Sequence, residues 1–410
     1  MTTTADRTSS SYTPIEARRY RRMMAALVAA GVATFAELYA IQSVLPDLAR
    51  SMDVGASDAA LTVSAATTGL AVGVFGWTWL ADRIGRLPAM RWAVLGAVVL
   101  GVLGSLAPDL VVLLPLRFLS GMALGAVPVL AVAYVHEVLT GWRAAAAAAA
   151  YISGTTVGGA AGRLVAGPLA PVLGWRGALL AVSAVSLLAA LVFLALAPAT
   201  PRPAGAPGPQ LSRIRAALSR SALLRLYLQA LLLTGCFVAV YNFLGFRLET
   251  APFGFDAAAV SLIFLTYGAG TVTARLAGRW LPRIGFARTT LIGMAAMLAG
   301  LVLLLADNVA ALLAGLVLFT GGFFIAHAAA AATTGSAAHP DYRSQAGAVY
   351  NTCFYLGSGL GGWLLGLAFD HAGWPVLTLF AVALLLAAAA LPTATLLRVR
   401  MAEGRTHGCH

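Results

Sequence analysis

The stretch Leu80-Ala81-Asp82-Arg83-Ile84-Gly85-Arg86 has a counterpart about two hundred residues later, Leu281-Pro282-Arg283-Ile284-Gly285-Phe286. Each stretch joins two long apolar segments, and each lies between the second and the third apolar segment of its own half of the chain. A motif that recurs at the same place in two halves indicates an internal duplication. The chain is therefore predicted to contain two copies of a six-helix unit, fused head to tail.

The composition excludes an ordinary soluble domain, because 60% of the residues are hydrophobic, 10% are charged and the mean hydropathy is +0.86. A spanning helix needs about 20 apolar residues. This length predicts twelve spans, near 24–45, 59–79, 89–107, 110–134, 145–171, 177–197, 223–246, 258–278, 287–305, 309–332, 345–369 and 374–397. Segments this long satisfy their backbone hydrogen bonds as helices. The predicted fold class is an all-α polytopic membrane protein, with 12 transmembrane helices in two pseudo-symmetric six-helix bundles.

The domain boundaries follow from a proline-rich break between the halves. Residues 198–222 are predicted as a cytoplasmic linker between an N-terminal bundle, 23–197, and a C-terminal bundle, 223–398. Residues 1–22 and 399–410 are predicted as a cytoplasmic arm and tail. Most arginines fall on the loops of one side, and the positive-inside rule then places both termini in the cytoplasm. We expect a multi-pass protein of the bacterial cytoplasmic (inner) membrane.

Several classes of function are not expected. The net charge of +12 reflects topology, because the arginines are scattered over loops, and so no nucleic-acid partner is predicted. Three cysteines form no disulfide framework. The sequence has no nucleotide loop, no metal-spaced His/Glu cluster and no appended domain, so we expect neither an enzyme nor a membrane sensor. The expected partners are a small-molecule substrate and the lipid bilayer, without cofactor or metal.

Glycine runs recur at equivalent places, in the fifth and the eleventh predicted span. The runs contain Gly154, Gly158, Gly159, Gly162 and Gly167 in the first half, and Gly357, Gly361, Gly362 and Gly366 in the second. Glycines at this spacing allow close approach of helix backbones and easy bending. Two interpretations stay open: packing grooves alone, or hinge-like contacts between moving halves.

At this point the chain resembles the major facilitator superfamily, in particular its twelve-span drug:proton antiporter branch, over residues 20–400. That family's loop between spans two and three follows G-x-L-a-D-r-x-G-r-k. The matching residues are Leu80, Ala81, Asp82, Arg83, Gly85 and Arg86, while Thr78 and Leu87 depart from the pattern. The resemblance implies a cytoplasmic gate, in which Asp82, Arg83, Gly85 and Arg86 latch the halves together.

Two further motifs extend the resemblance. Arg117-x2-Ser120-Gly121 corresponds to the family's fourth-span pattern, R-x-x-q-G-x-g. The antiporter pattern of span five, g-x3-G-P-x2-G-G, maps onto the glycine run, with Gly159 at the proline position and Arg163 at the last glycine position. The resemblance implies transport by two halves that rock around a central site, driven by a proton gradient.

Three charges are predicted to lie at one depth of the membrane. Counted from the external ends of their spans at about 1.5 Å per residue, Glu37 lies about 12 Å deep, Arg117 about 10 Å and Arg163 about 12 Å. Ionisable residues inside a membrane are functional candidates by default. Since an unpaired charge there is costly, we expect Glu37 to pair with Arg117 or Arg163. The pair is either static or a proton-coupling site, in which Glu37 exchanges a proton and its arginine partner changes.

Polar and aromatic residues of the spans are candidates for a substrate cavity: Tyr39, Gln42, Tyr241, Asn242, Tyr267, His327, Asn351 and Tyr355. Aromatic walls with a few hydrogen-bonding groups suit amphipathic small molecules. Each of these residues could equally form an interhelical hydrogen bond. A proton relay is a second alternative for His327, because the ordinary pKa of histidine is about 6.5.

The leading hypothesis is a proton-coupled exporter, an antiporter of small amphipathic drugs or metabolites that works as a monomer by alternating access. The alternative is a uniporter or symporter of a narrow hydrophilic substrate, such as a sugar or an amino-acid derivative. Two arginines against one carboxylate would favour a neutral or anionic substrate over a dication, if all three charges face the cavity.

Overall fold

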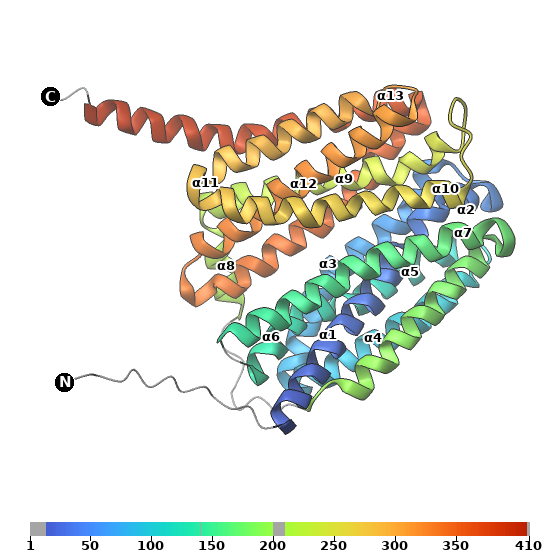
Figure 1. Ribbon diagram of the computed structural model, residues 1–410, viewed down its shortest axis with the longest axis horizontal. Helices are drawn as coiled ribbons and strands as arrows, with labels where there is room; N and C mark the ends of the chain where they lie inside the picture. The colour runs from blue at the N-terminus through green and yellow to red at the C-terminus, as the bar shows by residue number, and fades with distance from the viewer. Residues whose placement is uncertain (1–13, 140, 200–209, 408–410) are drawn as a thin grey trace.

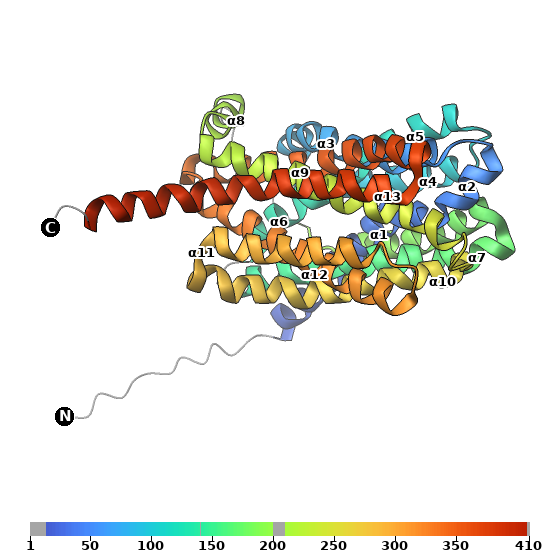
Figure 2. The same cartoon turned by 90° about the horizontal axis from the view of Figure 1, so that it is seen from above.

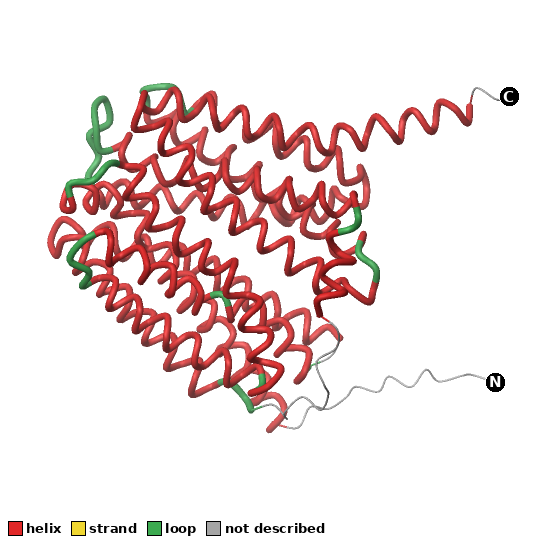
Figure 3. Tube along the Cα trace, turned by 180° about the vertical axis from the view of Figure 1, so that it is seen from behind, coloured by secondary structure: helices red, strands yellow, loops and turns green. Residues whose placement is uncertain are grey.

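The structure, a computed structural model, describes residues 14–139, 141–199 and 210–407, and every regular element in these ranges is a helix. In the first half these are α1 (Pro14–Tyr39), η1 (Ala40–Val44), α2 (Leu45–Met52), α3 (Ala56–Ile84), α4 (Arg86–Ser105), α5 (Leu110–Leu124), α6 (Ala126–Val138) and α7 (Gly141–Leu196). In the second half they are α8 (Gln210–Leu218), α9 (Ser221–Leu248), α10 (Ala257–Leu262), η2 (Ile263–Thr266), α11 (Tyr267–Leu303), α12 (Val309–Ala337), η3 (Pro340–Tyr342) and α13 (Arg343–His407). Within the described ranges, short loops join consecutive helices (Figure 3).

Parts of the predicted arm, linker and tail lie outside the described residues. Within the described ranges, α1 already begins in the predicted arm, α8 lies in the predicted linker, and α13 continues through most of the predicted tail. The predicted domain boundaries themselves stay a prediction.

Nine helical segments of the described chain are long and apolar enough to cross a membrane. Three of them, with 55, 47 and 54 residues, far exceed the ~20 residues that one crossing needs. Each of the three contains a glycine with a positive φ angle, at Gly174 (+67°), Gly285 (+79°) and Gly373 (+73°). Such angles are accessible to glycine and break the helix. Figure 1 shows α7 and α13 turning back on themselves.

The recurring motif of the sequence coincides with two such backbone positions. Gly85 ends α3 with a φ of +95°, and Gly285 interrupts α11 with a φ of +79°. The two glycines therefore make the same kind of sharp connection in the two halves, in agreement with the predicted duplication.

The helices form two bundles, one from each half of the chain (Figures 1 and 2). Within the bundles α1 packs on α7, α9 on α13 and α11 on α12, whereas α3 on α13 and α7 on α10 pack across the halves. The start of α1, α8 and the end of α13 lie at one end of the molecule, here called the terminal end. The bends of α7 and α13, together with α2 and α10, lie at the other, distal end.

The apolar core differs between the two ends. Toward the distal end one buried cluster includes residues of both halves, for example Leu45, Val63, Phe243 and Leu365. Toward the terminal end each half has a separate cluster, one around Met90 and the other with residues of α8, α9, α12 and α13. The halves are therefore joined by a common core at the distal end and not at the terminal end.

Candidate functional site

A buried polar bridge joins the two halves of the protein. The Gln42 side chain donates a hydrogen bond from Nε2 to Oδ1 of Asn242 at 2.7 Å. Its Oε1 accepts hydrogen bonds from Nε of Arg163, at 2.9 Å, and from the Nη2 group of the same guanidinium. All three residues are at most 3% exposed. Gln42 and Asn242 belong to the first span of their respective halves, so the bridge connects equivalent helices.

The local geometry of the first span places Gln42 in this bridge. The α-helical geometry of α1 ends at Tyr39, and the 3-10 turn η1 carries Gln42 before α2 begins. Pro46, in the first turn of α2, has no N–H to donate to the carbonyl of Gln42, so an unbroken α-helix is disfavoured here.

Three aromatic rings surround the Arg163 guanidinium. Its central carbon lies 4.7 Å from the ring centre of Tyr39, 4.5 Å from that of Phe264 and 4.9 Å from that of Tyr267. A cation over a desolvated ring gains about 2 kcal/mol. Tyr39 comes from the first half and the other two rings from the second, so both halves enclose the charge. We call Arg163, Gln42, Asn242 and these three rings the Arg163 site.

The Arg163 site has no negative charge and has unused hydrogen-bonding groups. Among the described residues Arg163 forms no ion pair; its remaining hydrogen bond goes to the carbonyl of Gly159 at 2.8 Å. Asn242 Nδ2 and Ser64 Oγ are buried without a partner. A methyl group added at Gly362 would lie 2.8 Å from Asn242 Nδ2 and 3.3 Å from Ser64 Oγ. A cation with spare polar groups beside it is chemically suited to an anionic or polar group of a ligand.

Glu37 does not lie in this site, and the expected pairing of Glu37 with an arginine is wrong for the described structure. Its carboxylate oxygens accept a hydrogen bond from Ser183 Oγ, at 3.2 and 3.3 Å, and lie against Gly101 of α4. Within the part of the chain that the structure describes, no arginine nitrogen lies within ion-pair distance of it. Glu37 faces the inside of the first bundle, whereas Arg163 faces the second half. Arg117 lies beside the same small cavity as Glu37, but its guanidinium donates to backbone carbonyls instead of the carboxylate.

A small cavity of about 10 Å³ adjoins Glu37 and is also lined by Gly101, Ser105 and Arg117. A volume of about 10–15 Å³ accommodates one water molecule. The buried carboxylate therefore has space beside it for a single proton-carrying water.

Arg117 stabilises the break in the first span. Its guanidinium donates to the carbonyls of Leu38 at 2.7 Å, Glu37 at 3.4 Å and Thr62 at 3.2 Å. Carbonyls at the end of an α-helix lack intrahelical partners and need others when they are buried. Arg117 supplies these partners where α1 gives way to η1.

The predicted gate residues lie at the terminal end. Arg86 forms an ion pair with Glu137 of the same half, and the Arg83 guanidinium lies 3.5 Å from the ring centre of Trp79. Asp82 is half-buried, and Gly85 makes the turn after α3. A latch between the halves stays a prediction for these residues.

The predicted glycines make close contacts inside each half. A methyl group at Gly158 would lie 2.6 Å from Cα of Val32, and one at Gly154 or Gly162 would overlap the backbone of α1. In the second half, methyl groups at Gly357 and Gly361 would overlap the backbone of α9. Gly159 supplies the carbonyl that Arg163 binds. These contacts agree with the interpretation of the glycine runs as packing grooves, and the hinge role stays a prediction.

Contacts between the halves involve other glycines of the same runs. A methyl group at Gly359 would lie 2.5 Å from Oγ1 of Thr68, and Gly366 lies against Ser57 in the same way. Gly167 of α7 packs on α10. Gly359 was not among the residues predicted from the sequence, although its position in the run is a signal for close approach.

The other predicted cavity residues are distributed over different environments. Tyr241 is buried inside the second half, where its hydroxyl lies 2.9 Å from Thr266 Oγ1 and 2.6 Å from Thr320 Oγ1. His327 Nδ1, on α12, lies 3.1 Å from the hydroxyl of Tyr350 on α13. His327 therefore forms an interhelical hydrogen bond, which is one of the roles predicted for it.

Asn351 and Tyr355 of α13 are separated by the structure. Asn351 is exposed, whereas Tyr355 is buried in a cluster with Leu38 and Leu70 of the first half. The sequence did not single out Phe264, Ser64 or Ser183, because serine and phenylalanine are common in spanning helices and carry no charge that would mark them.

Comparison with known proteins identifies the family. The sequence model of the Major Facilitator Superfamily matches residues 27–361 and 248–407. The chain is 31% identical over 359 residues to the uncharacterized MFS-type transporter YybF of Bacillus subtilis (strain 168), covering 87% of this chain and 88% of that protein. It is 33% identical over 359 residues to the inner membrane transport protein YnfM of Escherichia coli (strain K12), covering 87% and 86%.

The fold agrees with these matches. A bacterial homolog of the human lysosomal transporter Spinster, solved in an inward-facing and occupied conformation, gives a TM-score of 0.73 at 16% sequence identity, covering 90% of this chain and 95% of that chain. This likeness shows the fold, and the sequence matches show the family. The chain therefore belongs to the major facilitator superfamily: it is a multi-pass membrane transporter of small molecules and not an enzyme.

Proposed function

We propose that the protein is a secondary transporter of the bacterial inner membrane that crosses the bilayer twelve times, with both termini in the cytoplasm. The glycine breaks in α7, α11 and α13 support the number of crossings, since each divides an overlong segment into two. The arginine-rich loops at the terminal end support the orientation. The name of the relative YnfM, an inner membrane transport protein, supports the location.

The observation that carries the proposal is the unequal contact between the halves. At the distal end they share one core and two polar contacts: Arg50 pairs with Glu249 at 2.7 Å, and the Ser57 amide donates to Asp370 at 3.0 Å. At the terminal end each half has its own core. In alternating access this is the state that faces the cytoplasm. The opposite state requires the distal contacts and the Gln42–Asn242 bridge to separate.

Glu37 is proposed as the proton-coupling site. It is a carboxylate that is 6% exposed, has no ion-pair partner among the described residues, and adjoins a cavity the size of one water molecule. A buried carboxylate is costly to keep charged without a partner, so protonation and burial favour each other. This is the property that a proton-coupled exporter needs.

The Arg163 site is proposed to hold the substrate. Its uncompensated charge supports a small amphipathic molecule with a negative or polar group, and its rings support an apolar or aromatic body. Export of such drugs or metabolites in exchange for protons is the leading function. Uniport or symport of a narrow hydrophilic substrate, such as a sugar or amino-acid derivative, is the second, and the unpartnered Asn242 and Ser64 atoms favour it. Neither function involves a cofactor.

The test is proton movement in inverted membrane vesicles that contain the transporter and have an acidified interior. A panel of organic anions, neutral amphiphiles and cations is added outside, and release of protons from the interior is recorded. We expect a subset of compounds to evoke proton release in the wild type and not in Glu37→Gln. Ser183→Ala is the matched control, because it removes the hydrogen-bond donor of Glu37 and keeps the carboxyl group.

Three outcomes decide between the functions. Proton release that requires Glu37 and persists in Ser183→Ala supports proton-coupled export. Substrate uptake without proton movement in both Glu37→Gln and the wild type contradicts antiport and supports the uniporter. Equal proton release in Glu37→Gln shows that another group couples the proton.

A further inference from the structure

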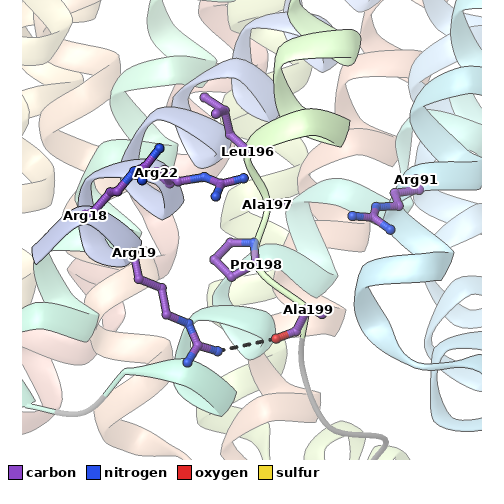
Figure 4. Close-up of a pocket in the computed structure, with 8 residues that line it drawn as sticks. All are labelled: Arg18, Arg19, Arg22, Arg91, Leu196, Ala197, Pro198 and Ala199. Atoms are coloured by element: carbon purple, nitrogen blue, oxygen red, sulfur yellow. Dashed lines mark hydrogen bonds between the residues drawn. The ribbon is translucent and has the colours of Figure 1, made fainter. Parts of the chain in front are cut away.

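Besides the small cavity beside Glu37, a larger and open cavity lies at the terminal end, away from the Arg163 site. It has a volume of about 660 Å³, within the range of about 300–1,000 Å³ that is usual for ligand pockets. Arg18, Arg19 and Arg22 of α1 form one wall, Arg91 of α4 forms another, and residues 196–199 at the end of α7 pass between them (Figure 4). We call this space the arginine cavity.

The arginines of this cavity have many more donors than the protein uses. Arg22 donates to the carbonyl of Ala195 at 2.9 Å, while Arg19 and Arg91 reach the carbonyls of Ala199 and Leu194 at 3.4 Å. These bonds cap the end of α7, where carbonyls lack partners. Each guanidinium has five N–H donors, so capping occupies only a small part of them.

The charge of the cavity is also uncompensated. None of its arginines forms an ion pair with a side chain that the structure describes, and the carboxylate of Glu137, on α6, is paired with Arg86. The Nε atom of Arg91 is buried and has no hydrogen-bond partner. Capping of α7 therefore leaves a cluster of positive charge without a partner among the described residues, and an anion in the cavity would neutralise it.

The position of the cavity indicates what kind of anion would reach it. The cavity lies near the first residues of α1 and α4 and the last residues of α7, so it lies close to one end of three helical segments that are long and apolar enough to cross a membrane. On α4 and α7, apolar side chains near the cavity are exposed: Trp92 on α4 and Leu188 and Leu191 on α7 are 69%, 66% and 52% exposed. Such a surface packs against acyl chains, and an exposed tryptophan is typical of the membrane interface.

We propose that the arginine cavity binds the phosphate headgroup of an anionic phospholipid. Arginine recognises phosphate through paired, charge-assisted hydrogen bonds, and basic pockets between spanning helices at the membrane surface bind such headgroups. The phosphate accepts hydrogen bonds from the free guanidinium groups, and the acyl chains lie along α4 and α7. The lipid then ties the start of the first span to the end of the sixth predicted span within one half. This proposal is independent of the substrate and of proton coupling.

The test uses native mass spectrometry of the full-length protein, purified in detergent with equal amounts of phosphatidylglycerol and phosphatidylcholine. We expect the wild type to retain phosphatidylglycerol preferentially. A basic residue near an anionic surface contributes about fivefold in affinity, so Arg22→Gln combined with Arg91→Gln is expected to reduce the preference by roughly 25-fold. The matched control, Arg279→Gln with Arg288→Gln, removes two exposed arginines of α11 and is expected to keep the preference.

Each result has a defined meaning. An equal loss of preference in both double variants shows that bulk charge attracts the lipid and overturns the proposal, as does an unchanged preference in Arg22→Gln with Arg91→Gln. Thermal unfolding in detergent is measured for each variant. If Arg22→Gln with Arg91→Gln is destabilised, the double variant Arg22→Lys with Arg91→Lys, which keeps both charges, is expected to restore part of the preference. Displacement of the lipid by millimolar sn-glycerol 3-phosphate would assign the cavity to a soluble phosphate ester instead.

Discussion

Substitution of Gln42 separates the stability of the polar bridge from its role in transport. Gln42→Leu removes the acceptor of two hydrogen bonds from the Arg163 guanidinium. A hydrogen bond to a charged group contributes about 1.5–3 kcal/mol, so the free energy of unfolding is expected to fall by roughly 3 to 6 kcal/mol. Gln42→Glu keeps an acceptor, and Asn242 can turn its unpartnered Nδ2 toward the new carboxylate. This second variant is therefore expected to unfold like the wild type.

The same two variants differ in the charge that they offer to a substrate. In Gln42→Glu the Arg163 guanidinium is neutralised inside the protein and no longer attracts an anion. Two unit charges 4 Å apart at an effective dielectric constant of 20 interact by about 4 kcal/mol. The affinity for an anionic substrate is therefore expected to fall more than about a hundredfold, while that for a neutral analogue changes little.

Unfolding is measured by titration with SDS in mixed micelles, followed by the fluorescence of the eight tryptophans. Affinity is measured from the concentration dependence of transport in vesicles, with an anionic substrate and its neutral ester or amide. Transport of the anion with wild-type affinity by Gln42→Glu would refute the assignment of Arg163 to the substrate. Wild-type stability of Gln42→Leu would refute the strength given to the bridge.

Two further predictions follow from other contacts. Gly361→Ala overpacks the contact with α9 and is expected to lower the free energy of unfolding by about 1–3 kcal/mol. At Gly347 the added methyl group would meet no neighbouring atom within 4 Å, so Gly347→Ala is expected to raise the free energy of unfolding by up to about 1 kcal/mol. Thermal unfolding in detergent compares the two variants, and equal effects would contradict the packing at Gly361. Burial raises the pKa of Glu249 above its ordinary value, although Arg50 acts in the opposite direction. Proton uptake therefore favours the state in which the distal ends touch. Lowering the pH from about 7 to about 5 should increase the population of this state, measured as the fraction of short distances between spin labels at the distal ends of α3 and α9. A change that persists in Glu249→Gln would show that another group titrates.

The sequence indicates which charges are buried better than it indicates which neighbours they face. Glu37, Arg117 and Arg163 are predicted inside spans, and all three are buried in the structure, while their common depth in the membrane stays a prediction. The rotation of each helix about its axis depends on its neighbours, and Ala-, Leu- and Gly-rich spans have apolar residues on every face. For this reason the sequence could not predict that Glu37 faces Ser183, that Arg117 caps the break after Tyr39, and that Arg163 faces the second half.

Glycine is more informative here than charge. The duplicated motif predicts equivalent connections, and Gly85 and Gly285 both adopt positive φ angles. The glycine runs predict close helix contacts, and Gly158 lies against the backbone of α1. A glycine often marks a position that needs a positive φ angle or a close backbone contact, which few other residues allow, whereas a polar side chain such as Gln42 or Tyr241 can form hydrogen bonds with several partners, and only the tertiary structure defines which.

The mixed origin of the Arg163 site has a consequence for the energetics of the transport cycle. The cation belongs to one half, whereas two of its rings and one bridging amide belong to the other. Separation of the halves at the distal end therefore removes most of the shielding of Arg163 in a single movement. If the substrate is an anion held at Arg163, as proposed, the loaded transporter carries a neutralised pair through this transition, whereas the empty transporter carries an unpaired cation. We then expect the substrate to lower the barrier to its own passage.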